Sequence, residues 1–379
     1  MINSTKINLD QKIKYLIIFS PVILIVLQSY FKQTLIGYSS ILGFTCWPEG
    51  FYWILRTFLV SIFIISIFKL TPLEIIRPEK YVDIYAKEKA MRDPLMGLRA
   101  LACMNVFFGH WFMVVFGPNI PAHTQIDQTL RIALSFSPWA GVWIFFTISG
   151  YLMGKGFVTG RHSIDKGGLK KFYSNRILRI FPIYFFSIFL VATLVSPSNL
   201  DIRNSGTWND IFSSLLFDQQ GGGAIGALWS VSTEFSFYLL APFLFLIISV
   251  LFKKARGLLF FMLVLCAIFG AIKFWILSNF PELWHTRIYM PLLLNLDCFI
   301  SGMVTSFLVK DRLSDNKHIP HGLKIGIFVT LFFQSILSAW SFHEMASYDG
   351  IPGSSTRFYF LSYAPGLVAL MSCLIIYIF

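Results

Sequence analysis

Ten stretches of this chain are long and apolar enough to cross a lipid bilayer as helices. A helix needs about 20 apolar residues to span the hydrocarbon core. Backbone groups inside hydrocarbon must find their hydrogen-bond partners within the helix. We therefore predict an all-α, polytopic integral membrane protein with about ten transmembrane helices. The predicted spans are 15–31, 51–70, 97–116, 134–154, 177–196, 228–251, 257–277, 288–309, 322–341 and 358–379.

The composition favours a membrane domain over a soluble one. The chain is 56% hydrophobic and only 13% charged, whereas soluble domains carry about 25% charged residues. A net charge of +12 would suggest a nucleic-acid partner in a soluble protein. Here it is the excess expected of basic cytoplasmic loops, so we expect a lipid bilayer around the chain and no nucleic acid. The five cysteines show no metal-binding spacing, and we expect no metal site.

Basic residues gather in alternate loops along the chain. One side holds 24 of the 31 lysines and arginines, and such an excess marks the cytoplasmic side. We predict a cytosolic N-terminus, in a bacterial inner membrane or a eukaryotic endomembrane or plasma membrane. We predict two parts. Residues 1–92 hold two N-terminal helices and a charged cytoplasmic connector, and residues 93–379 form a membrane domain. The charged segment 71–96 lies where the two parts meet. The chain stops inside an apolar run, IIYIF, which leaves open a C-terminal truncation.

The third predicted span carries an arginine and a histidine on one face. Arg99 and His110 are eleven residues apart, close to three helical turns, which places His110 about 16 Å deeper than Arg99. Ionisable groups at such depth usually face a cavity or a partner. Because the pKa of histidine lies near working pH, His110 is a candidate general base for an acceptor hydroxyl. The alternative is a histidine that is hydrogen-bonded between helices.

Two other polar residues inside predicted spans have a structural alternative. Ser149 is a candidate nucleophile, but the usual G-x-S-x-G pattern is absent around it. Gly150 and Gly154 beside it favour close helix packing instead. Asp297 lies in the eighth span, where it either lines the cavity or forms a structural hydrogen bond.

Two arginines follow the longest basic loop. Arg176 and Arg179 are three residues apart and share a face at what we predict to be the start of a helix. Arginines at a helix N-terminus form an anion site, and the phosphates of coenzyme A fit such a site. The alternative is an attraction of this loop to anionic lipid head groups.

The sixth predicted span carries a carboxylate near its outer end. Glu234 lies about 9 Å into the span, and Tyr238 shares its face four residues later. A carboxylate at that depth needs a partner, for which His110 and Arg131 are candidates. Trp229, at the start of the span, is either part of the site or an anchor at the membrane interface.

Taken together, these segments resemble motifs of the acyltransferase-3 family of membrane O-acyltransferases, over about 93–379. Three positions depart from the family pattern, namely Met96, Asn175 and Ala227. The similar segments and matching residues are the Arg-ten-residues-His pair (Arg99, His110), FFTISGYL (Phe145, Phe146, Ser149, Gly150), NRILRIFP (Arg176, Arg179, Pro182), LWSVSTEFSFY (Trp229, Ser230, Glu234, Phe237, Tyr238) and DCFISG (Asp297, Phe299, Gly302).

The resemblance implies an enzyme that uses acyl-CoA as co-substrate, with no permanently bound cofactor. It implies His110 as the base, and we expect Glu234 to orient the base or bind the acceptor. The acceptor would be a hydroxyl of a glycan or of a small lipophilic molecule, and the acyl group acetyl. The rival interpretations are a secondary transporter and a non-catalytic family member. The expected donor-binding residues are Arg99, Arg176 and Arg179, and the expected substrate-binding residues are Ser149, Trp229, Ser230, Tyr238 and Asp297.

Overall fold

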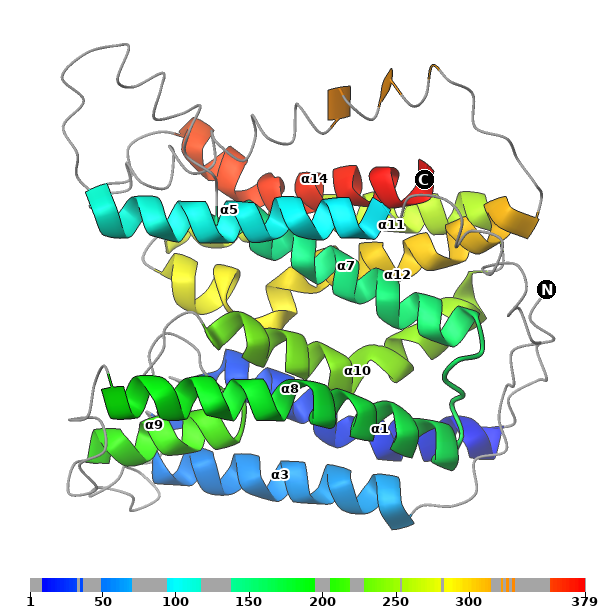
Figure 1. Ribbon diagram of the computed structural model, residues 1–379. Helices are drawn as coiled ribbons and strands as arrows, with labels where there is room; N and C mark the ends of the chain where they lie inside the picture. The colour runs from blue at the N-terminus through cyan, green and yellow to red at the C-terminus, as the bar shows by residue number, and fades with distance from the viewer. Residues whose placement is uncertain are drawn as a thin grey trace. The chain divides into compact units, whose positions relative to one another are not determined.

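The structure is a computed structural model whose described residues form helices joined by turns, with no strand among them (Figure 1). The predicted all-α fold is thereby confirmed for this part of the chain. The described residues are 9–32, 35–36, 49–69, 94–116, 138–194, 205–218, 228–252, 254–280, 283–314, 322, 325–326, 329–330 and 355–378. The helices are α1 (Leu9–Tyr30), α3 (Gly50–Lys69), α5 (Pro94–Phe116), α7 (Pro138–Val158), α8 (Lys166–Leu194), α9 (Ser205–Leu215), α10 (Trp229–Leu251), α11 (Ala255–Asn279), the π-helix η5 (Trp284–Tyr289), α12 (Leu292–Ser314) and α14 (Ser355–Ile378).

Within the described residues, six helices are long and apolar enough to cross a membrane: α7, α8, α10, α11, α12 and α14. The chain is therefore a multi-pass membrane protein. α1 and α3 contain shorter apolar segments, Phe19–Gln28 and Tyr52–Phe63. The predicted span 322–341 falls largely outside the described residues. The count of ten and the cytosolic N-terminus stay predictions.

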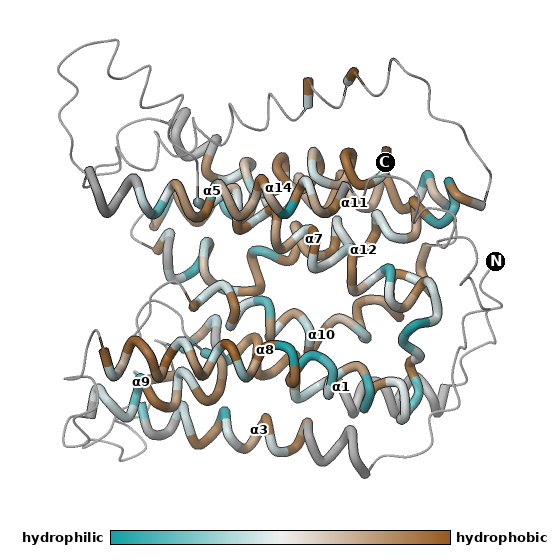
Figure 2. The backbone as a smooth tube through the Cα atoms, viewed as in Figure 1, coloured by the Kyte–Doolittle hydropathy of each residue, from teal (hydrophilic) through white to brown (hydrophobic). Residues whose placement is uncertain are grey.

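One predicted boundary was wrong. We expected a helix over 177–196, but α8 begins at Lys166 and is 29 residues long. Its first half carries the basic residues and its second half is apolar, as the change from teal to brown along α8 shows (Figure 2). The apolar pattern marked only the hydrophobic half, because hydropathy finds the segment that suits lipid and misses a polar helical extension.

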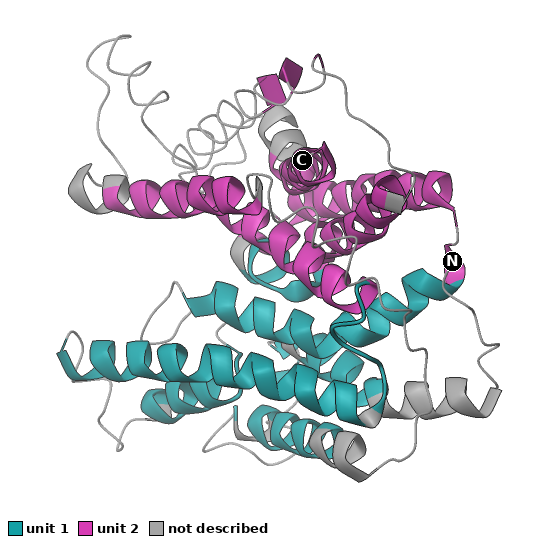
Figure 3. Ribbon diagram, turned by 45° about the vertical axis from the view of Figure 1, so that its right-hand side comes forward, with its two compact units in different colours: residues 1–80, 159–250, 285–293 teal, residues 81–158, 251–284, 294–379 magenta. Residues whose placement is uncertain are grey.

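The chain divides into two compact units (Figure 3). Unit 1 consists of 1–80, 159–250 and 285–293, and unit 2 of 81–158, 251–284 and 294–379. The two N-terminal helices α1 and α3 therefore belong to the same unit as α8, α9 and α10. Unit 2 contains α5, α7, α11, α12 and α14.

Unit 2 is held together by close approach of backbones. A Cβ atom at Gly150 on α7 would overlap the carbonyl oxygen of Phe299 on α12, and one at Gly302 on α12 would overlap that of Thr147 on α7. The rings of Phe146 and Phe299 stack beside this crossing, with centroids 4.5 Å apart. Small residues let two helices meet at van der Waals distance in a membrane. The FFTISGYL and DCFISG segments thus form the two sides of one helix contact.

Unit 1 packs through aromatic side chains. Phe63 of α3 meets Tyr173 of α8 edge to face, with ring centroids 5.7 Å apart. Phe19 of α1 lies 5.4 Å from Phe243 of α10 by the same measure. α1 also packs along α3. Edge-to-face and tilted ring pairs are favourable because the positive ring edge meets the negative ring face.

Candidate functional site

α8 and α10 bring three predicted site residues into contact in unit 1. The guanidinium carbon of Arg176 lies 5.3 Å from the centre of the Tyr238 ring, within cation–π range. The Tyr238 hydroxyl donates a hydrogen bond to Oε1 of Glu234, one turn earlier on α10. Tyr238 is buried and Glu234 is half-buried. A cation, a phenol and a carboxylate thus form a row across the helix contact, which we call the α8–α10 row.

A neighbouring bond fixes α8 against α10. The Tyr173 hydroxyl donates to the backbone carbonyl of Leu239, with 3.0 Å between the oxygens. Tyr173 is 8% exposed, so this bond is shielded from water. It precedes Arg176 by almost one turn of α8, and it limits how far the two helices can slide.

The predicted helix N-terminus beside the arginines was wrong, because α8 starts nearly three turns before Arg176. Asp165 caps that start. Its Oδ1 accepts a hydrogen bond of 2.6 Å from the backbone N–H of Gly168, and its carbonyl accepts one from Leu169. The carboxylate already occupies the positive end of the helix dipole. Any anion site at Arg176 and Arg179 therefore rests on the arginine side chains themselves.

A buried histidine, which sequence reasoning missed, adjoins Arg176. Phe172 lies between them: the His162 ring meets it edge to face at 5.2 Å, and the Arg176 guanidinium lies 5.7 Å from its centre. Burial, and then the nearby charges of Arg176, Arg161 and Lys171, lower the pKa of His162 to about 4. His162 is thus neutral at physiological pH within a cationic region. Sequence reasoning missed His162 because it lies in a basic loop whose residues we assigned to the cytoplasmic surface.

Arg176 has spare hydrogen-bonding capacity. Its Nε is buried and has no hydrogen-bond partner in the described part of the chain. Arg179, one turn later, is exposed. A guanidinium that stacks on rings while a donor stays unused is suited to bind an anion.

The first turn of α10 is covered by η5 and the residues after it. The Trp229 and Tyr289 rings lie 4.3 Å apart, and Thr233 Oγ1 donates to the carbonyl of Met290 at 2.6 Å. Trp229 is buried, while Ser230 is half-buried. Burial against Tyr289 accounts for Trp229 without a membrane interface. Sequence reasoning missed Tyr289, because its neighbours form no motif.

Arg99 and His110 lie on the unbroken helix α5 in unit 2, as the spacing predicted. Arg99 is half-buried and His110 is exposed. Nδ1 of His110 lies 2.7 Å from the Val106 carbonyl oxygen. A carbonyl can only accept, so Nδ1 carries the proton of the neutral ring and Nε2 is its basic nitrogen.

Ser149 and Asp297, also in unit 2, are both buried, and Asp297 forms structural contacts. Ser149 is 8% exposed beside the crossing of α7 and α12. Asp297 Oδ2 lies 2.7 Å from Nζ of Lys273 on α11, and both side chains are almost completely buried. Its Oδ1 accepts from the N–H of Cys298 at 3.0 Å. These contacts favour the structural alternative for Asp297, and burial beside the helix crossing favours it for Ser149. Lys273, which lies inside the predicted span 257–277, is the partner that sequence reasoning missed.

The predicted residues therefore form one set in each unit. Unit 1 holds Arg176, Arg179, Trp229, Ser230, Glu234 and Tyr238, and unit 2 holds Arg99, His110, Ser149 and Asp297.

One comparison with known proteins finds a relationship. The family model for an acyltransferase domain, that of the acyltransferase-3 family, matches residues 95–379. No curated protein and no solved structure matches the chain. The matched region begins with α5, so α1 and α3 precede it, and it includes every predicted site residue.

Proposed function

This chain belongs to the acyltransferase-3 family of membrane acyltransferases, and from that premise we propose that it moves an acyl group from cytosolic acyl-CoA to an acceptor hydroxyl. The acyl group is acetyl, and the acceptor is a glycan or a small lipophilic molecule. The family match and the apolar helices support a membrane acyltransferase in general. The donor, the acceptor and the roles of individual residues belong to the proposal.

The α8–α10 row is the observation that supports this function most directly. It joins the NRILRIFP and WSVSTEFSFY motifs, which are far apart in sequence, through the contacts of Arg176, Tyr238 and Glu234. Arg176 and Arg179 supply cations for the donor phosphates, with Arg99 as a third. Glu234 is ionisable and keeps further acceptor positions for the proton of an acceptor hydroxyl, while the Tyr238 hydroxyl holds its carboxylate in place.

The reaction we propose is direct acyl transfer. The acceptor hydroxyl oxygen attacks the thioester carbon while Nε2 of His110 takes the hydroxyl proton. The tetrahedral intermediate then collapses with loss of the C–S bond, and the departing sulfur takes the proton from the His110 imidazolium. The products are an ester and coenzyme A, with no net change in protons. Glu234 binds the acceptor or orients the base.

A secondary transporter remains the second candidate, since it also combines membrane helices with a few buried charges. It predicts movement of a substrate without loss of the thioester. Release of free thiol from acyl-CoA, matched by label in an ester product, separates the two candidates.

The test uses the purified full chain in lipid nanodiscs, acetyl-CoA labelled in the acetyl group, and lipid and glycan extracts as acceptors. His110→Ala and His110→Gln are each expected to fold, to bind acetyl-CoA, and to lose transfer by about a hundredfold or more, the usual contribution of a general base. Glutamine can bond to Val106 but cannot take a proton. The control is His321→Gln, a histidine outside the motifs. Full transfer by His110→Gln would refute the base, and a wild type that binds no acetyl-CoA would refute the function.

A further inference from the structure

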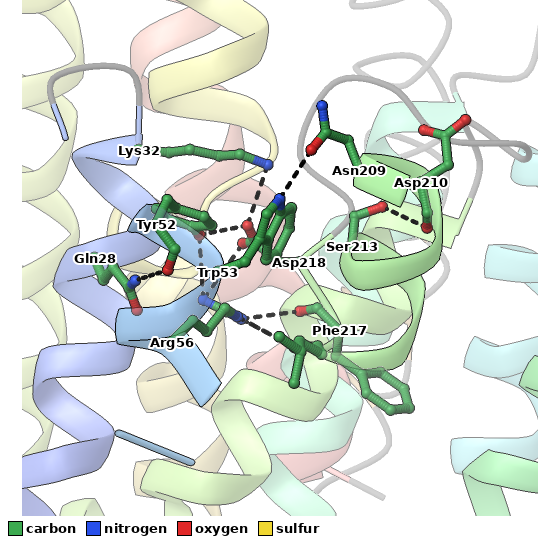
Figure 4. A network of polar contacts seen from close by, with 11 residues as sticks. Gln28, Lys32, Tyr52, Trp53, Arg56, Asn209, Asp210, Ser213, Phe217 and Asp218 are labelled. Carbon is green, nitrogen blue, oxygen red and sulfur yellow. Dashed lines mark hydrogen bonds and ion pairs between the residues drawn. The ribbon is translucent and has the colours of Figure 1, made fainter. Parts of the chain in front are cut away.

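A buried carboxylate joins the two N-terminal helices to the segment that follows α9, as Figure 4 shows. Asp218 is 1% exposed and lies three residues after the end of α9. It accepts a hydrogen bond from the Tyr52 hydroxyl, pairs with Arg56 Nη1 at 3.6 Å, and pairs with Lys32 Nζ at 3.4 Å. Lys32 also lies over the rings of Tyr52 and Trp53. All of these partners come from residues before the family match.

Arg56 does more than neutralise Asp218. Its Nη2 donates to the carbonyl oxygens of Leu216 at 3.1 Å and Phe217 at 3.3 Å, and its Nε also reaches Leu216 at 3.3 Å. The Arg56 side chain is 2% exposed. The last carbonyls of a helix lack partners within the helix. Arg56 therefore binds the backbone at the end of α9 through Nε and Nη2 while its Nη1 faces Asp218, a spread of donor nitrogens that the single ammonium of a lysine does not have.

The backbone held by Arg56 is unusual. Phe217 has a φ of 51°, in the left-handed region. Its N–H bonds to the carbonyl of Ser214, and the N–H of Asp218 to that of Ser213. These two bonds form a Schellman helix end, in which glycine normally occupies the left-handed position. A phenylalanine there is disfavoured by its Cβ, so the ring must contribute something that glycine would not.

The ring of Phe217 fills the space between α8 and α10. It stacks on Phe235 of α10 at 4.2 Å and on Tyr184 of α8 at 4.4 Å between centroids, and it lies 5.0 Å from Phe181. Phe235 directly follows Glu234 in the sequence. The chain of contacts therefore runs from Arg56 and Asp218, through Phe217, to the turn of α10 that carries Glu234.

We propose that Arg56 and Asp218 are positioning residues, which hold Phe217 as a wedge that sets α10 and Glu234 against α8. The N-terminal helices are then part of the working unit although the family match does not include them. The effect on catalysis rests on the proposed function of Glu234. The packing can be tested apart from it.

The packing test is a pair of double-mutant cycles on the full chain in nanodiscs, read as the midpoint of thermal unfolding. Arg56→Lys keeps the charge opposite Asp218 but loses the bonds to the two carbonyls. Its midpoint shift is expected to be strongly non-additive with Phe235→Leu, which removes the ring against the wedge. It is expected to be additive with Phe243→Leu, the same change on the same helix against Phe19. Additivity in both cycles would overturn the proposal.

The wedge has a second test in Phe217→Gly, which relieves the left-handed backbone and deletes the ring. The proposal expects a midpoint several degrees lower, whereas a purely backbone role expects one equal to or above the wild type, and that result would overturn it.

The catalytic arm measures acetyl transfer at saturating acetyl-CoA. Arg56→Lys is expected to lower the turnover rate roughly tenfold, because displaced groups at a reacting centre cost rate steeply, with donor affinity kept within about twofold. Coupling in the first cycle with unchanged turnover would overturn the positioning role and leave only packing. A wild type that transfers nothing would refute the proposed function, while the cycles would still decide the wedge.

Discussion

The α7–α12 crossing of unit 2 and the α8–α10 row of unit 1 are both made from family motifs, but they are built in opposite ways. At the crossing, Gly150 and Gly302 remove side chains so that two backbones touch. In the row, Arg176, Tyr238 and Glu234 place charged and polar groups against each other. A motif residue can therefore serve packing or chemistry, and the contacts of its side chain distinguish the two. Substitutions at the packing positions should lower the stability of the fold, and substitutions in the α8–α10 row should weaken ligand binding.

The largest effect is expected at the glycine crossing. Gly302→Leu forces a side chain into the backbone of Thr147, so we expect loss of several kcal/mol of stability, in the range of severe overpacking. Little folded protein should be recovered, by size-exclusion chromatography in detergent. Gly97→Leu on α5 is the matched control, since nothing lies within 4 Å of a Cβ there. Normal folding of Gly302→Leu would contradict the close crossing.

The buried pair of Asp297 and Lys273 tests whether a charged motif residue can serve packing and not chemistry. Lys273→Met leaves the carboxylate buried without its cation, which costs about 3–5 kcal/mol. The double variant Lys273→Met and Asp297→Leu is expected to recover most of this loss, because apolar residues of similar size replace a buried pair at little cost. Thermal unfolding of the three proteins measures it. Acyl transfer retained in the double variant would remove Asp297 from the substrate-binding set, and transfer lost despite recovered stability would restore it.

The row should behave differently. Arg176→Ala is expected to weaken acyl-CoA binding by about 1.5–3 kcal/mol, roughly tenfold or more, with a small change in unfolding midpoint. Arg176→Lys keeps the charge but loses the planar stack on Tyr238, so we expect it to recover only part of the affinity. Calorimetry in nanodiscs measures both, with the exposed Lys170→Ala on the same helix as control. Unchanged affinity in both Arg176 variants would return this arginine to the lipid-anchor interpretation.

The all-α fold and most helix positions were predictable, because an apolar run of membrane length can cross a bilayer in few ways other than as a helix. The spacing of Arg99 and His110 on one helix, and of Glu234 and Tyr238 on another, follows from helical geometry alone. The start of α8 was not predictable, since its polar first half has no apolar signal. The partners Lys273, His162 and Tyr289 were missed because each contact depends on how separate helices meet, which no local pattern encodes. Asp218 was missed for the same reason. In the sequence, Arg56 is at least 160 residues away from the carbonyl groups beside Asp218 that it binds.

The smallest expected effect concerns His162, at the cationic end of the row. Its pKa is about 4 in the folded chain, against an ordinary value of 6.5. Above pH 6.5 the ring is neutral in both the folded and the unfolded chain, so its contribution is constant. As the pH falls from 6.5 to 4, only the unfolded chain takes up the proton, so stability must fall across that window. The unfolding midpoint of the wild type should therefore drop more steeply between these pH values than that of His162→Gln.

The same histidine reports on what the cations around it bind. Arg176, Arg161 and Lys171 help to keep its pKa low, and phosphates of a bound donor would cancel part of that repulsion. Binding of acetyl-CoA near pH 5 should then raise the pKa of His162 and take up protons, which calorimetry detects as a heat that depends on the ionisation enthalpy of the buffer. The uptake should vanish in His162→Gln. Donor binding with no proton uptake in the wild type would place the phosphates away from this end of α8. The donor would then need an anion site other than the α8–α10 row.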